Sequence, residues 1–157
     1  MLFTTKCIKM YKEAKEIQKD WKPEVGDYCI CGRGMIGVLT SNKKQKVTYP
    51  DGNTGYAYVG VRLEDGAPWS SRKPIWLPTQ EQLQEILWQY LRRKWDVDDS
   101  CKFGVFLVAV NNYVDNFGMS IVNAFTSCQE LWLDLVMSKK YNKIWWHGKE
   151  KWVKREE

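Results

Sequence analysis

Pro78 divides the chain between two patterns of apolar residues. Before it, residues 25–78 contain short apolar or alternating runs, separated by glycine, proline or aspartate turns. This spacing is typical of a small antiparallel sheet or an SH3-like barrel. After it, Thr79 and Gln82 match a capping box, in which the hydroxyl accepts a free helix N–H and the glutamine bonds back to the cap. The two patterns together predict an α+β fold.

The predicted elements form a single α+β domain over residues 1–157, an ordinary length for one domain. Residues 1–22 make an N-terminal helix with one apolar face. The β-rich part follows at 25–78. The helical part at 79–157 ends in a β-hairpin whose turn lies at 147–150.

Turn residues and the spacing of apolar residues predict the strands and helices within these parts. Strands are expected at 28–31, 35–40, 46–49, 56–63 and 74–77. Helices are expected at 5–21, 80–94, 101–117 and 128–141. The candidate caps besides Thr79 are Thr4 or Thr5, Ser100 and Ser127, and Ser127 with Glu130 matches a second capping box. Gly118 is the expected stop of the helix at 101–117.

Cysteine usage and hydropathy indicate the compartment. The five cysteines are scattered without a disulfide framework, which favours reduced thiols. No signal peptide is visible, and no run approaches the length of a membrane span. We therefore expect a cytoplasmic protein with no membrane partner. Cys29 and Cys31 lack the second close pair that a zinc site would need, so no metal is expected.

The motifs of common enzymes are missing from the sequence. There is no nucleophile elbow, no Walker loop and no dinucleotide fingerprint. The single histidine, His147, falls in a predicted turn. We predict that the protein is not an enzyme, with no catalytic residues and no cofactor.

Charge and aromatic residues point instead to binding. Residues 1–78 carry 13 basic and 8 acidic side chains, whereas residues 79–157 carry 11 of each, so the whole excess of +5 lies in the first part. Cations hold phosphates, and a base stacked on an aromatic ring contributes about 1–3 kcal/mol. The alternative is that the rings fill a small barrel and the lysines solvate its turns. The candidate ligand-binding residues are Lys43, Lys44, Lys46, Tyr49, Tyr56, Tyr58, Arg62, Trp69 and Arg72.

Three segments carry a resemblance to a family. Residues 76–84 resemble the Trp-Leu-Pro-x-Gln-x-Gln-Leu-Gln pattern of small phage and prophage proteins from Gram-positive hosts. Residues 127–133, with a Ser-x-x-x-Leu-Trp-Leu pattern, and residues 21–28 are similar to other parts of the same group. The resemblance implies a phage origin, so that the expected cytoplasm is that of the host cell, and it carries over no catalytic residue.

The sequence thus predicts a non-enzymatic phage accessory protein that counters host defence by sequestering a nucleotide-type anion. The alternative is a protein-binding inhibitor of a host nuclease or CRISPR effector, because tryptophan and tyrosine anchor such interfaces. A phage enzyme with an unrecognised site is a third interpretation. A homo-oligomer is possible, but no heptad pattern in the sequence requires one.

Overall fold

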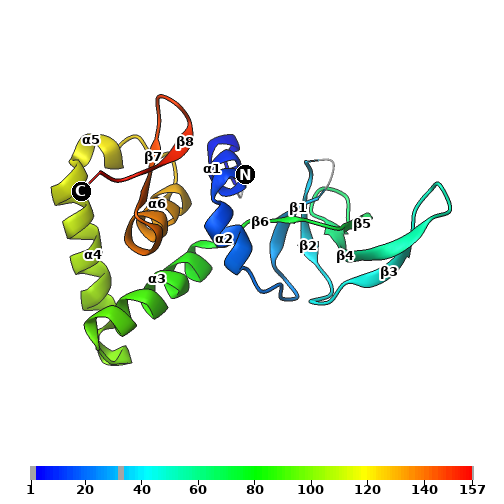
Figure 1. The fold of residues 1–157 in the computed structure, drawn as a ribbon, viewed down its shortest axis with the longest axis horizontal. Helices are drawn as coiled ribbons and strands as arrows, with labels where there is room; N and C mark the ends of the chain where they lie inside the picture. The colour runs from blue at the N-terminus through cyan, green and yellow to red at the C-terminus, as the bar shows by residue number, and fades with distance from the viewer. Residues whose placement is uncertain (1–2, 32–33, 157) are drawn as a thin grey trace. The chain divides into compact units, whose positions relative to one another are not determined.

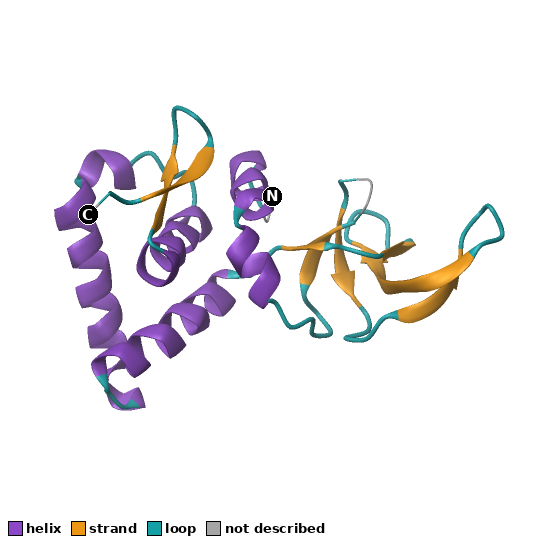
Figure 2. Cartoon of the chain, viewed as in Figure 1, coloured by secondary structure: helices purple, strands orange, loops and turns teal. Residues whose placement is uncertain are grey.

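The computed structural model describes residues 3–31 and 34–156, and it separates them into two compact units. Residues 15–78 form the first, here called the sheet unit. Residues 3–14 and 79–156 form the second, called the helical unit. Figure 2 shows strands dominating one unit and helices the other, which confirms the predicted α+β class. That the units make one domain stays a prediction.

The sheet unit is built on an antiparallel sheet (Figure 1). Its strand order is β3-β4-β2-β1-β6, and β5 pairs with β4. The elements are α2 (Lys15–Asp20), β1 (Tyr28–Ile30), β2 (Ile36–Leu39), β3 (Gln45–Thr48), β4 (Thr54–Arg62), β5 (Pro68–Ser71) and β6 (Ile75–Trp76). The five predicted strands are confirmed within two residues at each end, whereas β5 was not predicted.

Strand β4 organises this sheet because it pairs with three others. Its first half, residues 54–57, pairs with β3, and its second half pairs with β2 and β5. Register places Trp69 of β5 directly opposite Gly60 of β4. The Trp69 ring covers this glycine and Gly37 of β2, so a methyl group at position 60 would lie 2.7 Å from the ring. Two glycines therefore make the space in which the indole is buried.

We predict that Gly37→Ala destabilises the sheet unit by about 1–3 kcal/mol, because the added carbon would overlap the Trp69 indole and lie 2.8 Å from the Val61 carbonyl oxygen. Chemical denaturation measures the loss. Trp69→Phe provides the control in a double-mutant cycle: the smaller ring relieves part of the overlap, so the two costs must not add. Additive costs would contradict this account.

The helical unit contains α1 (Thr5–Glu13), α3 (Gln80–Trp95), the 3-10 turn η1 (Asp99–Cys101), α4 (Lys102–Phe117), α5 (Met119–Val122), α6 (Cys128–Tyr141), β7 (Lys143–Trp146) and β8 (Lys151–Lys154). Strands β7 and β8 form the predicted hairpin. Both bonds of the Thr79 capping box are present. Gly118 ends α4 as predicted. No described helix combines the length and the hydropathy needed to cross a membrane.

Two sequence expectations were wrong. The helix expected at 5–21 is interrupted at Ala14, whose ψ of 67° leaves the helical region, so α1 ends there and α2 starts anew. Ser100 does not cap α4. Asp98 caps η1 instead, by accepting from the Ser100 N–H, and α4 begins from Cys101 without a side-chain cap.

A buried carboxylate, Glu130, fixes α1 against α6. It accepts hydrogen bonds from the Thr4 and Thr126 hydroxyls and pairs with Lys6 at 3.2 Å. Burial alone would raise the pKa of Glu130, but these donors together hold it below its ordinary value. Only half of the predicted second capping box forms: Ser127 accepts from the Glu130 N–H, while the carboxylate bonds to Thr126.

A second buried carboxylate, Asp134 on α6, joins α4 to β7. It accepts from the Tyr113 hydroxyl and, at 2.7 Å, from the Trp145 N–H. Burial outweighs these two donors and raises the pKa of Asp134 to about 6. The folded protein therefore takes up a proton at this site more readily than the unfolded chain does.

This shift predicts a falling stability between about pH 4 and pH 6. In that window the unfolded chain has lost its Asp134 proton and the folded protein keeps it, so raising the pH favours unfolding. Two pKa units correspond to a loss of at most about 3 kcal/mol. Urea denaturation from pH 4 to pH 7 measures it. Asp134→Asn keeps an acceptor for Trp145 and should flatten this part of the profile; an unchanged slope in that variant would contradict the assignment.

Candidate anion-binding hairpin

The β3–β4 hairpin gathers most of the predicted ligand-binding residues. Pairing of the two strands sets Lys46 directly opposite Tyr56. Lys43 and Lys44 lie in the turn that leads into β3, and all three lysines are exposed. Figure 1 shows this hairpin extending beyond the other strands of the sheet. The lysine side chains are therefore open to solvent.

Arg72, which follows β5, is held against Tyr49 at the end of the hairpin. Its guanidinium lies 5.0 Å from the centre of the Tyr49 ring, and its Nε donates to the phenol oxygen at 3.1 Å. Gly55 leaves room for the pair, since a methyl group there would lie 3.2 Å from the tyrosine ring and 3.4 Å from the Arg72 guanidinium. The guanidinium is thus positioned in advance, with its remaining N–H groups available.

Acidic groups compensate this charge only slightly. Within the described chain, Lys43, Lys44, Lys46 and Arg72 take part in no ion pair. Asp51, at the hairpin tip, has a lowered pKa mainly because the Asn53 N–H and side chain donate to it, with a weaker contribution from the charge of Arg72. The hairpin keeps a clear positive excess.

Aromatic side chains support the hairpin base. The Lys44 ammonium lies 5.5 Å from the centre of the Tyr58 ring. Tyr58 in turn contacts Trp21, whose ring stacks on Trp76 at 5.8 Å, and Trp21 donates to Asp27 at 2.8 Å. Sequence reasoning did not assign Trp21 to this region, because its spacing placed it at the end of the first predicted helix.

The structure separates two predicted residues from this group. Trp69 is 8% exposed and packs with Cys29, Cys31 and Leu39 in the core of the sheet unit. Arg62 lies at the opposite end of β4 from Tyr56 and forms an ion pair with Asp65. The burial of Trp69 supports the alternative interpretation, in which this ring fills the core and does not contact a ligand.

Only one ring of the hairpin is well exposed. Tyr56 is 65% exposed, whereas Tyr49 and Tyr58 are half-buried. Trp76, in the same unit, is buried like Trp69. A stacked base would therefore meet Tyr56 alone.

Potential metal ligands and the single histidine form the last group of candidate residues in the described part of the chain. They contain no group of three or more histidine, cysteine or acidic side chains arranged to hold a metal ion. Cys29 and Cys31 are buried in the sheet unit, and burial raises the pKa of Cys29 well above its ordinary value. Burial also lowers the pKa of His147, which lies near Phe125.

Comparisons of the chain with protein-family models, with curated proteins and with solved structures gave no match. The assignment of the hairpin therefore depends on its own geometry.

The different burial of Trp69 and Tyr56 predicts a large loss of stability for one alanine variant and almost none for the other. Trp69→Ala should cost about 3–5 kcal/mol, because it empties a core position. Tyr56→Ala should change the free energy of unfolding by less than about 0.5 kcal/mol, because the ring is mostly in solvent. Thermal unfolding of both variants tests this, and a large loss for Tyr56→Ala would show that its ring is structural.

Proposed function

We propose that the protein binds a nucleotide-type anionic ligand at the β3–β4 hairpin and acts by sequestering it. The observation that supports this is the set of four cations, Lys43, Lys44, Lys46 and Arg72, without ion-pair partners among the described residues. An uncompensated cluster of this kind attracts phosphate groups over a Debye length of about 10 Å at ordinary salt.

Arg72 supplies the directional contact. A guanidinium donates two parallel hydrogen bonds to a phosphate, and less entropy is lost when the side chain is already held in place. The ring and hydroxyl of Tyr49 hold Arg72 in this way. Lys46 and Tyr56 lie on the other face of the hairpin, because Arg72 packs at Gly55, the residue before Tyr56 on β4. The lysines therefore act on a phosphate at Arg72 through long-range attraction.

Tyr56 supplies the contact to a base. The exposed ring lies on the strand next to Lys46, so one base could stack on it while its phosphate meets the lysine. A single exposed ring fits one or two nucleotides better than a long strand, which would need several stacking platforms.

The biological role follows from the resemblance to small phage proteins. A phage protein that holds a nucleotide without transforming it would counter host defence by removing a signalling nucleotide. A second candidate, a protein-binding inhibitor of a host nuclease or CRISPR effector, is favoured by the exposed apolar side chains of α4 in the helical unit.

The binding proposal predicts a rise in melting temperature with linear or cyclic nucleotides, since a ligand of the folded state stabilises it. Titration by isothermal calorimetry should then show affinity falling as salt rises. Arg72→Gln should weaken binding at least tenfold. Arg62→Gln is the matched control, because Arg62 is already paired with Asp65 at the other end of β4, and it should leave affinity unchanged.

Two probes separate the contacts to phosphate and base. Tyr56→Ala should weaken binding of the nucleotide and leave binding of inorganic pyrophosphate unchanged. If no nucleotide raises the melting temperature, or if Arg62→Gln weakens binding as much as Arg72→Gln, the hairpin is not the site.

A further inference from the structure

The end of the chain carries a positive charge that the overall balance of residues 79–157 conceals. Those residues hold 11 basic and 11 acidic side chains, but residues 139–155 alone hold seven basic and one acidic, a net charge of +6. This segment comprises the end of α6 and the hairpin of β7 and β8, here called the C-terminal hairpin. The pKa of Lys139 is lowered, mainly by burial and further by the positive charges of Arg155 and Lys94. Positive groups therefore crowd together in this part of the helical unit.

One face of the C-terminal hairpin is anchored to the rest of the helical unit. Trp145 and Trp152 pair across the two strands, their ring centres lie 5.2 Å apart, and Trp145 is buried. The Trp152 indole N–H donates to the Met10 carbonyl at 3.0 Å. Glu150, the one acidic residue of the segment, forms an ion pair with Lys9. The hairpin is thus held in place, and its acidic group is already compensated.

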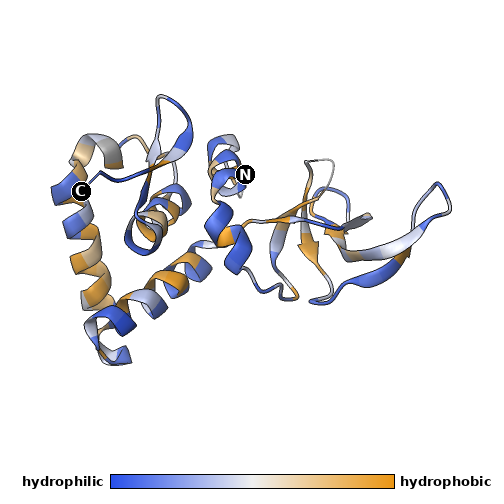
Figure 3. Ribbon diagram, in the orientation of Figure 1, coloured by the Kyte–Doolittle hydropathy of each residue, from blue (hydrophilic) through white to orange (hydrophobic). Residues whose placement is uncertain are grey.

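The other face carries an exposed aromatic ring next to two cations. Side chains alternate between the faces of a strand, so Trp146 and Lys151, which pair directly, point away from Trp145 and Trp152. The Trp146 side chain is 47% exposed. The Lys149 N–H closes the turn by donating to the Trp146 carbonyl at 3.1 Å, and the Lys149 ammonium lies 4.2 Å from the ring centre. Figure 3 shows this turn coloured as hydrophilic. Lys149 and Lys151 take part in no ion pair within the described chain.

This combination of groups matches a nucleotide within a strand. A base stacks on an exposed aromatic ring, and cations hold the phosphates of the backbone. A stacked base contributes more than a cation–π contact at an exposed site, so a base can displace the Lys149 ammonium from the Trp146 ring and leave it free to bind a phosphate. The other cations of residues 139–155 would attract the phosphates that follow along the strand. A strand therefore matches this segment better than a single nucleotide does.

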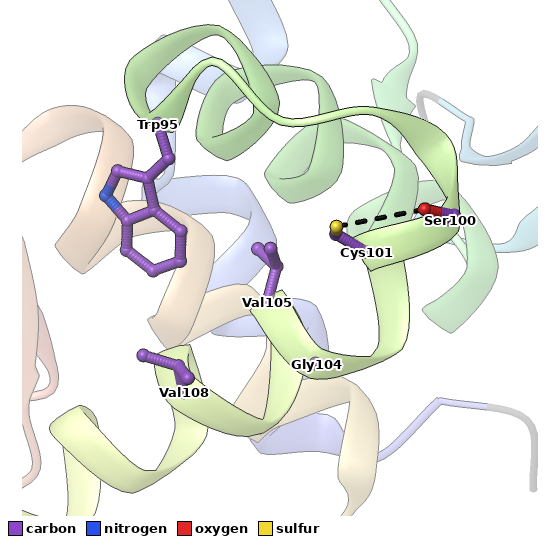
Figure 4. Close-up of a pocket in the computed structure, with 6 residues that line it drawn as sticks. All are labelled: Trp95, Ser100, Cys101, Gly104, Val105 and Val108. Atoms are coloured by element: carbon purple, nitrogen blue, oxygen red, sulfur yellow. Dashed lines mark hydrogen bonds between the residues drawn. The ribbon is translucent and has the colours of Figure 1, made fainter.

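The hollow on the helical unit offers no comparable site. It has a volume of about 520 Å³ and is lined by Trp95, Ser100, Cys101, Gly104, Val105 and Val108 (Figure 4), none of which is charged. A phosphate would find no cation among these lining residues. Within this unit, a polyanion is therefore better matched by the C-terminal hairpin.

We propose that the C-terminal hairpin binds single-stranded nucleic acid, with one base stacked on Trp146 and phosphates held by Lys149 and Lys151. This site is independent of the β3–β4 hairpin, because its residues belong to the other compact unit. With one ring available, the phosphate contacts supply much of the affinity, so binding falls steeply as salt rises. A duplex keeps its bases stacked inside and could use the lysines alone.

Fluorescence anisotropy of a labelled oligothymidylate, titrated with the full chain, tests the proposal. We expect Trp146→Ala to raise the dissociation constant at least fivefold, because the stacked base is lost. Trp146→Phe keeps a ring and should raise it less. Phe103→Ala is the matched control, because Phe103 is 75% exposed but lies on α4, outside this segment, and it should leave the affinity unchanged. Thermal unfolding checks that each variant is folded.

The salt dependence of the same titration is a second readout. Each phosphate contact to a single strand contributes about 0.7 to the slope of log affinity against log salt. Lys151→Gln should therefore reduce the slope by about 0.7. Lys102→Gln removes the same charge from an ion pair with Glu85 and should leave the slope unchanged.

Several results would overturn the proposal. One is a wild type that does not bind the oligonucleotide at low salt, and another is a Trp146→Ala variant that binds as the wild type does. A duplex that loses as much affinity as the single strand on Trp146→Ala would contradict the stacked base. A loss caused by Arg72→Gln and not by Trp146→Ala would place the strand on the β3–β4 hairpin instead.

Discussion

The packing of Trp69 on the glycine backbone at positions 37 and 60 is the contact on which the sheet unit depends. It joins β5 to β4 by register and to β2 by direct contact. Because β4 continues from these residues into the hairpin with β3, the same packing holds the base of the candidate site. A residue predicted to touch the ligand thus has an indirect role, since it supports the strand that carries Tyr56.

The sequence predicted those parts of the fold that depend on local signals. The Thr79 capping box, the stop at Gly118 and the terminal hairpin are all encoded within a few residues. It missed β5, although β5 pairs with the preceding strand β4, because Pro68–Ser71 begins with proline and carries a single large apolar side chain, Trp69. In the same way, the Ser127 pattern predicted a local partner for Glu130, whereas Thr4 and Lys6, far away in the chain, bind its carboxylate.

The residues of the candidate site also fall into those that local signals predict and those that depend on the tertiary structure. Lys43, Lys44, Lys46 and Tyr56 could be predicted because a hairpin of short strands brings its own neighbours together. The support of Arg72 by Tyr49 joins residues on different strands and needs the register of the sheet. Whether an aromatic ring can stack on a base depends on its burial, and the alternation of residues along a short strand does not reveal that burial. Tyr56 is exposed, whereas Trp69 is buried.

The charged residues of the β3–β4 hairpin contribute to binding in two different ways. Lys43, Lys44, Lys46 and Arg72 have no ion-pair partner among the described residues, but only Arg72 is held in one position, by the ring and hydroxyl of Tyr49. A positive charge attracts a phosphate over about 10 Å without touching it, so the lysines can raise the rate at which an anion reaches the hairpin. The lifetime of the complex then depends on the directional contacts, because a guanidinium held in advance loses less entropy when it binds.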